Sequence, residues 1–147
     1  MNPAREDLLI DMGVVFNRGF TYSESDGTTP DFSEWTGILV ARPYPEAPPL
    51  LTMTNGSGVT LGTGGHIDLA LSAAETSAIT IPGFMDWGPF PADGTDTSPH
   101  DANVVGRIGV WEIRLFEPGT DHSFVPMAGT ICFREGPGLG ISPIPVP

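Results

Sequence analysis

Residues 110–116 read Val-Trp-Glu-Ile-Arg-Leu-Phe, and this stretch decides the fold class. Apolar and charged side chains alternate in it, so that Trp111, Ile113 and Leu115 fall on one face and Glu112 and Arg114 on the other. Alternation with a period of two is typical of a β-strand that buries one face. We therefore expect a strand here, with its apolar face turned into a core.

Segments of the same kind recur along the chain and are separated by turns. The chain holds 19 glycines and 16 prolines, which interrupt the apolar stretches instead of forming one tract. Asp26-Gly27 and Asn55-Gly56 are pairs typical of tight turns. The other strand-like segments are residues 8–12, 16–22, 35–42, 51–54, 59–61, 67–71, 124–127 and 130–134.

The clearest helical signal lies at residues 72–78. Ser72 and Glu75 stand three positions apart, the spacing of a capping box, and predict a short turn through Ala78. The pattern as a whole predicts an all-β fold. We expect an immunoglobulin-like antiparallel β-sandwich of about seven or eight strands, with one short helical turn and extended termini.

A length of 147 residues fits one domain. We expect the sandwich to span residues 8–135, between an N-terminal arm at 1–7 and an extended arm rich in proline and glycine at 136–147. Residues 83–106 are irregular and form a predicted inserted loop. A loop of that length in a compact domain is usually functional or ordered by a neighbour.

The charge of the chain is strongly negative. It carries 18 acidic residues against 6 basic ones, for a net charge of −12, and every basic residue is arginine. A protein that binds the phosphate groups of nucleic acid needs a basic patch on its surface. We therefore expect neither nucleic acid nor an anionic membrane surface among its partners.

The chain also lacks the sequence signs of export. Its first residues have mixed charge, and no apolar run approaches the ~20 residues that a membrane-spanning helix needs. The single cysteine, Cys132, has no intramolecular partner and is expected to be a buried thiol. These features predict synthesis in a reducing cytoplasm.

No pattern of catalytic residues stands out, and we expect no enzyme, no cofactor and no small-molecule substrate. The serines lack a Gly-x-Ser-x-Gly elbow, and His66, His100 and His122 are not paired at metal-binding spacing. Asp93, Asp96 and Asp101 lie in the predicted loop, but their spacing does not match a calcium loop. We predict no metal site, and binding of a cation by this acidic loop stays open.

Three stretches together resemble a known family. Residues 7–16 read Asp-Leu-Leu-Ile-Asp-Met-Gly-Val-Val-Phe and are followed by Ser25-Asp26-Gly27 and by Trp35-Thr36-Gly37. Within residues 51–78, Gly-Val-Thr-Leu at 58–61 leads into Gly-Gly-His-Ile-Asp-Leu-Ala-Leu-Ser-Ala-Ala-Glu-Thr at 64–76. In the third stretch, residues 110–115 are followed by a turn and then by Gly-Thr-Ile-Cys-Phe at 129–133. Over about two-thirds of its length the chain resembles small tail and baseplate structural proteins of tailed phages. It is similar to the N-terminal immunoglobulin-like domain of siphophage baseplate upper proteins.

The resemblance implies a structural role without catalytic residues. It implies a virion location, in the tail or baseplate more than in the head, after synthesis in the host cytoplasm. The partners would then be other virion structural proteins and copies of the chain itself. The chain departs from the family pattern at residues 83–106, where the family passes almost directly from the helical turn to the next strand.

The leading hypothesis is a tail, baseplate or fibre-attachment adaptor whose rigid sandwich is a spacer and whose ends and long loop dock neighbouring subunits. One alternative is a capsid decoration or head-fibre protein. Another is a carbohydrate-binding module with Trp87 and Phe90 as a stacking platform. The aromatic residues of the loop either cap the sandwich or project as a contact surface. The candidate interface residues are Phe84, Trp87, Phe90, Ile141, Ile144 and Val146.

Overall fold

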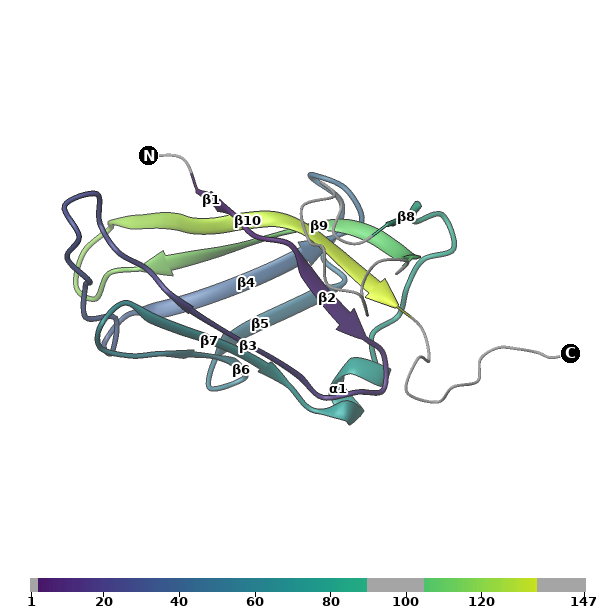
Figure 1. Ribbon diagram of the computed structural model, residues 1–147, viewed down its shortest axis with the longest axis horizontal. Coiled ribbons are helices and arrows are strands. Elements are labelled where there is room, and N and C mark those ends of the chain that lie inside the picture. The colour runs from purple at the N-terminus through teal and green to yellow at the C-terminus, as the bar shows by residue number, and fades with distance from the viewer. Residues whose placement is uncertain (1–2, 90–104, 135–147) are drawn as a thin grey trace, which may run out of the picture.

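The computed structural model describes residues 3–89 and 105–134, and the chain in them is all-β and sandwich-like (Figure 1). A single short helix interrupts the strands. The elements are β1 (Ala4–Arg5), β2 (Leu8–Asp11), β3 (Phe16–Thr21), β4 (Thr36–Arg42), β5 (Leu51–Asn55), β6 (Gly58–Leu61), β7 (His66–Leu71), α1 (Ala73–Ser77), β8 (Trp87–Pro89), β9 (Val105–Phe116) and β10 (Ser123–Arg134).

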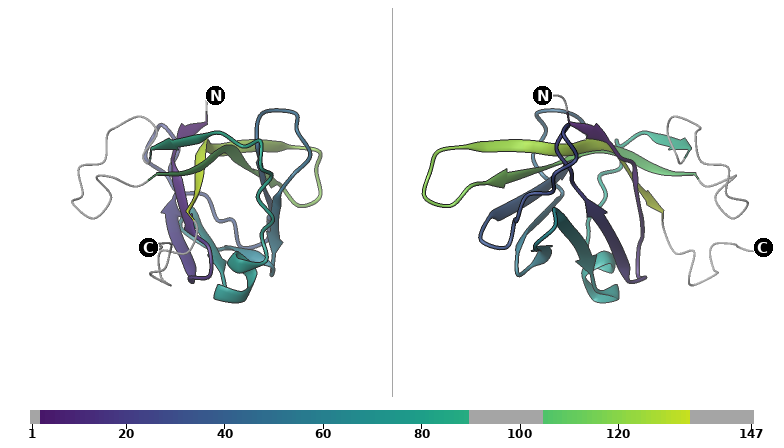
Figure 2. Two further views of the ribbon diagram at one scale, coloured as in Figure 1. Left: turned by 90° about the vertical axis from the view of Figure 1, so that its right-hand side faces the viewer. Right: turned by 60° about the vertical axis from the view of Figure 1, so that its left-hand side comes forward.

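All the strands belong to one curled sheet. Its order is β1-β10-β9-β4-β5-β6-β7-β3, with β2 also paired to β10 and β8 paired to β9. Viewed along the long axis, the strands surround a common interior (Figure 2). Most neighbours are antiparallel, but β1 and β2 run parallel to β10, and a two-residue parallel bridge joins β5 to β6. The sheet is therefore mixed.

The predicted apolar faces do form the core. Ile67, Leu69 and Leu71 of β7 are buried, as are Trp111, Ile113 and Leu115 of β9. Ile131 and Phe133 of β10 are buried too, and Leu39 and Ala41 supply the inner face of β4. Each fully buried Leu, Ile or Phe stabilises the fold by about 1.5–3 kcal/mol relative to an exposed one.

The helical turn is built as the sequence predicts. Ser72 Oγ accepts the N–H of Glu75, and the Glu75 carboxylate accepts the N–H of Ser72, which completes a capping box. The helix places Thr76 under the β2–β3 turn. The fully buried hydroxyl of Thr76 accepts the N–H of Gly13 at 2.9 Å and lies 3.0 Å from the carbonyl of Val14, to which it can donate.

The long hairpin β9–β10 is more extensive than the sequence suggests. β9 begins at Val105, inside the predicted loop 83–106, and that loop also contains β8. In β10 the register shifts between Phe124 and Met127. Pro126 lies at this point and lacks the N–H that a regular ladder needs, which accounts for the irregularity.

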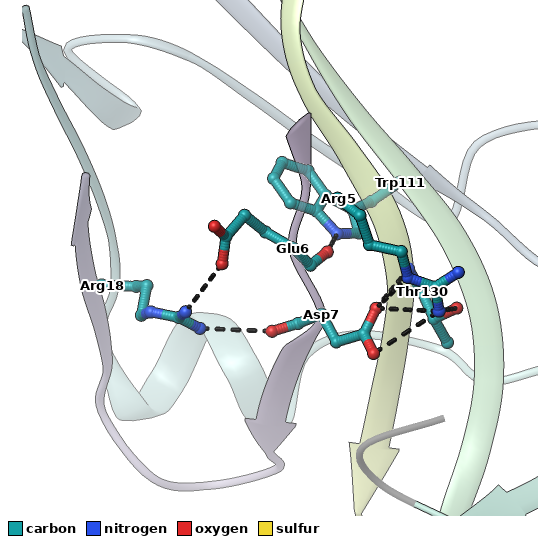
Figure 3. Close-up of polar contacts among 6 residues, drawn as sticks. All are labelled: Arg5, Glu6, Asp7, Arg18, Trp111 and Thr130. Atoms are coloured by element: carbon teal, nitrogen blue, oxygen red, sulfur yellow. Dashed lines mark hydrogen bonds and ion pairs between the residues drawn. The ribbon is translucent and has the colours of Figure 1, made fainter. Parts of the chain in front are cut away.

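Residues 4–7, which the sequence places in an N-terminal arm, are paired with β10. Ala4 faces Met127 and Leu8 faces Ile131, so β1 and β2 keep one register along β10. The ladder is interrupted at Glu6 and Asp7. There the carboxylate of Asp7 accepts the N–H of Thr130 at 3.1 Å, and the carbonyl of Glu6 accepts Trp111 Nε1–H at 2.8 Å (Figure 3).

Arg18 of β3 links the two edges of the curled sheet. Its guanidinium donates to the main-chain carbonyl of Asp7 at 3.2 Å and to the Glu6 carboxylate at 3.3 Å (Figure 3). Farther along the same edge, Arg134 forms a two-pronged ion pair with Asp11 at 2.7 and 3.0 Å. Side chains, and not a further strand ladder, join β3 to the N-terminal segment.

Candidate functional site

One end of the molecule exposes three large aromatic side chains. Phe84 is 67% exposed, Trp87 59% and Tyr44 53%. Phe84 comes from the segment leading into β8, Trp87 is the first residue of β8, and Tyr44 comes from the connection between β4 and β5. The rings of Tyr44 and Phe84 lie 6.3 Å apart between centroids. We call Tyr44, Phe84 and Trp87 the aromatic patch.

Arg107 of β9 holds this segment in place. Its Nη1 donates to the carbonyls of Gly83 at 3.0 Å and Met85 at 2.8 Å. Its guanidinium also lies over the ring of Trp87, 4.2 Å from the centroid, in a cation–π contact. The arginine therefore fixes both the backbone and one aromatic ring of the patch.

The sequence left open whether these aromatic residues cap the sandwich or project from it. Met85 performs the capping, since it is 3% exposed and belongs to the core cluster. Its neighbours Phe84 and Trp87 project. Of the other predicted interface residues, Phe90, Ile141, Ile144 and Val146 lie outside the described residues, as do Asp93, Asp96 and Asp101. Tyr44 was not predicted, because the proline-rich stretch around it gives no periodic signal.

The chain has a pocket of about 320 Å³ whose lining includes residues next to β3 and β4 and in β10. The end of β3, the start of β4 and the start of β10 lie at the end of the long axis opposite β8 (Figure 1). The pocket is formed by the connection between β3 and β4 and by the tip of the β9–β10 hairpin. We call it the aromatic pocket. The aromatic and charged side chains that line it are Tyr22, Glu24, Phe32, Trp35, His122 and Phe124.

The rings of the aromatic pocket meet at steep angles. Trp35 lies edge-on to Phe124, with centroids 5.9 Å apart and planes at 84°, and it is edge-on to His122 at 83°. Phe32 is fully buried beneath them. The sequence pattern predicts that a strand starts at Trp35. It does not predict the contact of Trp35 with His122 and Phe124, because Trp35 and His122 lie 87 positions apart along the chain.

The loop beside the aromatic pocket is acidic. Asp26 accepts the N–H and the hydroxyl of Thr28, and these hydrogen bonds lower the pKa of its carboxyl group. Bonds from the hydroxyl and N–H of Ser33 lower the pKa of Asp31 in the same way. Burial, and then the charge of Glu24, raise the pKa of the Tyr22 phenol.

Other candidate groups do not come together. Among residues 3–89 and 105–134, no group of three or more His, Cys, Asp or Glu side chains could hold a metal ion. His66 pairs with Asp68 of its own strand at 2.9 Å on the surface. Cys132 is buried, as expected. In the same described parts, no helix is long and apolar enough to cross a membrane.

No protein-family model and no curated protein matches this sequence.

Proposed function

We propose that this chain is a non-catalytic structural subunit of a tailed-phage virion, in the tail, the baseplate or a fibre-attachment position. The sequence resemblance at residues 7–16, 51–78 and 110–115 supports the virion assignment. The observation that supports docking is the aromatic patch. Aromatic side chains and arginine are enriched in protein interfaces, and patches that stay exposed in a soluble chain mark contact sites.

The occupant of the aromatic patch is a neighbouring protein subunit. Phe84 and Trp87 project from a segment whose backbone is held by Arg107, so little conformational entropy is lost when a partner covers them. A glycan is a less suitable occupant of Trp87, because the guanidinium of Arg107 already covers one face of its ring. An experiment must therefore distinguish binding of a protein subunit from binding of a glycan.

Mass spectrometry of purified particles tests the assignment. Heads and tails are separated, and the copy number of this chain is measured in each fraction. A fixed copy number in tails supports the proposal, whereas a fixed number in heads favours the decoration or head-fibre alternative. Absence from both fractions, together with specific binding on a glycan array, would point to a carbohydrate-binding module.

A further inference from the structure

We propose that the aromatic pocket binds the guanidinium group of an arginine side chain presented by a partner protein. This inference concerns the end of the molecule opposite the aromatic patch, and it holds whether or not the chain belongs to a virion.

The shape of the aromatic pocket favours a compact cation. Trp35 stands nearly perpendicular to Phe124 and His122, and Tyr22 is tilted by 60° against Phe124. Rings set at such angles form walls, whereas a sugar ring stacks best on one flat aromatic face. A cation enclosed by several ring faces interacts with each of their quadrupoles. Phe32 closes the floor and keeps the site apolar.

The charges around the aromatic pocket favour a cation too. Glu24 lines the pocket itself. Residues 22–31 contain three carboxylates, at Glu24, Asp26 and Asp31, and no basic residue. Hydrogen bonds lower the pKa values of Asp26 and Asp31 below the usual range for aspartate, so both keep their negative charge well into acid solution.

The chain supplies neither lysine nor arginine to this place, where His122 is the one basic side chain among the described lining residues. It has no lysine, and none of its six arginines lines the pocket in the described part of the chain. The arginines are used elsewhere: Arg5 pairs with Asp7, Arg18 with Glu6 and Arg134 with Asp11. Arg42 and Arg107 donate to main-chain carbonyls, and Arg114 donates to Ser123. The ligand must therefore come from another molecule.

Arginine fits the aromatic pocket better than lysine or a small metal ion. A guanidinium group is planar and weakly hydrated, so it enters an apolar, ring-lined site at a smaller desolvation cost than an ammonium group. The carboxylate of Glu24 can accept hydrogen bonds from one edge of the guanidinium group, while the two faces of that group contact the aromatic rings. A bare metal ion would need several oxygen ligands, and the described lining offers one carboxylate.

A titration with short peptides tests this inference. The full chain is titrated with an acetylated, amidated Gly-Arg-Gly peptide and with the same peptide carrying neutral citrulline, and NMR follows the Trp35 indole resonance. Localisation by NMR matters because the indoles of Trp87 and Trp111 report other surfaces. The expected result is a saturable shift at Trp35 with the arginine peptide, absent with citrulline and weakened by added salt.

Two matched variants distinguish the effect of the pocket's own carboxylate on arginine binding from the effect of the net charge of the chain. Glu24→Gln removes the carboxylate that lines the aromatic pocket, and Glu34→Gln removes an exposed carboxylate of the same loop. We expect Glu24→Gln to weaken arginine binding about two- to fivefold and Glu34→Gln to leave it nearly unchanged. Equal shifts with arginine and citrulline peptides, no shift at Trp35, equal effects of the two variants, or a response to a neutral methyl glucoside alone would overturn the inference.

Discussion

The carboxylate of Asp7 accepts the main-chain N–H of Thr130 at 3.1 Å, in a ladder where a carbonyl oxygen would ordinarily be the acceptor. The Glu6 N–H donates to Ala128, so the carbonyl of Glu6 would be the regular acceptor for Thr130 in this parallel ladder; because the side chain of Asp7 satisfies Thr130, that carbonyl accepts the indole N–H of Trp111 instead. The main-chain carbonyl of Asp7 faces the other edge of the sheet, where it accepts Arg18. A single aspartate thus both continues the pairing with β10 and joins β3 to the N-terminal segment.

Replacing Asp7 with alanine should destabilise the fold by about 1–3 kcal/mol, because it leaves the N–H of Thr130 without its acceptor in a partly buried place. Urea unfolding measures the change in free energy. Asp7→Asn retains an acceptor oxygen and is expected to lose less. If Asp7→Ala and Asp7→Asn unfold together with the wild type, the role assigned to this carboxylate is wrong.

Gly129→Ala should cost at least about 2 kcal/mol of stability. A Cβ at position 129 would overlap the carbonyl oxygen of Glu6, which is itself held by the indole of Trp111. Gly83→Ala is the matched control, since a Cβ there meets nothing within 4 Å. Thermal unfolding of the two variants should differ clearly, and similar melting temperatures would contradict the close packing of the N-terminal segment on β10.

Thr76→Val should destabilise the chain by about 1–3 kcal/mol although the two side chains have nearly the same shape. The buried hydroxyl accepts the N–H of Gly13 and contacts the carbonyl of Val14, and valine leaves both groups unpaired. Thr76→Ser keeps the hydroxyl and serves as the comparison. Chemical denaturation in which serine costs as much as valine would mean that the methyl group, and not the hydroxyl, is what matters.

Cys132 should be unreactive in the folded chain. Burial raises the pKa of its thiol from 9.0 to about 11, so almost no thiolate exists at pH 8. A chromogenic disulfide reagent should label it slowly until the protein is unfolded. Because the folded state holds the proton more tightly, this contribution to stability is present below pH 9 and is lost as the pH rises toward 11. Cys132→Val should therefore show a smaller decline in stability over that interval, and an equal decline would refute the assignment.

Local pattern was sufficient to predict most of the fold. The buried faces at 67–71 and 110–115 follow from alternation alone, and the capping box at Ser72 and Glu75 needs no tertiary information. The N-terminal segment was harder. Leu8 and Ile10 signal a strand, but nothing local indicates that β1 and β2 run parallel to β10, more than 120 residues away. The pairing depends on the side chain of Asp7 and on the absence of a side chain at Gly129.

The candidate surfaces were predictable in part. Aromatic residues in an irregular stretch pointed to Phe84 and Trp87, while the inward turn of Met85 depends on how Arg107 fixes the backbone. The aromatic pocket could not be predicted, because it is assembled from two segments, the β3–β4 connection and the tip of the β9–β10 hairpin, that meet only when the sheet curls. Its parts, Tyr22, Trp35 and Phe124, each look locally like ordinary strand or core residues.

We propose that the aromatic patch docks this chain into a virion. The most direct measurement is the amount of chain that co-purifies with assembled particles for the wild type, for the double variant Phe84→Ala/Trp87→Ala, and for Val15→Ala, which alters an exposed apolar residue on the β2–β3 turn. We predict equal incorporation of the wild type and Val15→Ala and loss of the double variant, with all three folded by circular dichroism. If the wild type is absent from particles, or if the double variant is fully incorporated, the aromatic patch does not dock this chain into a virion.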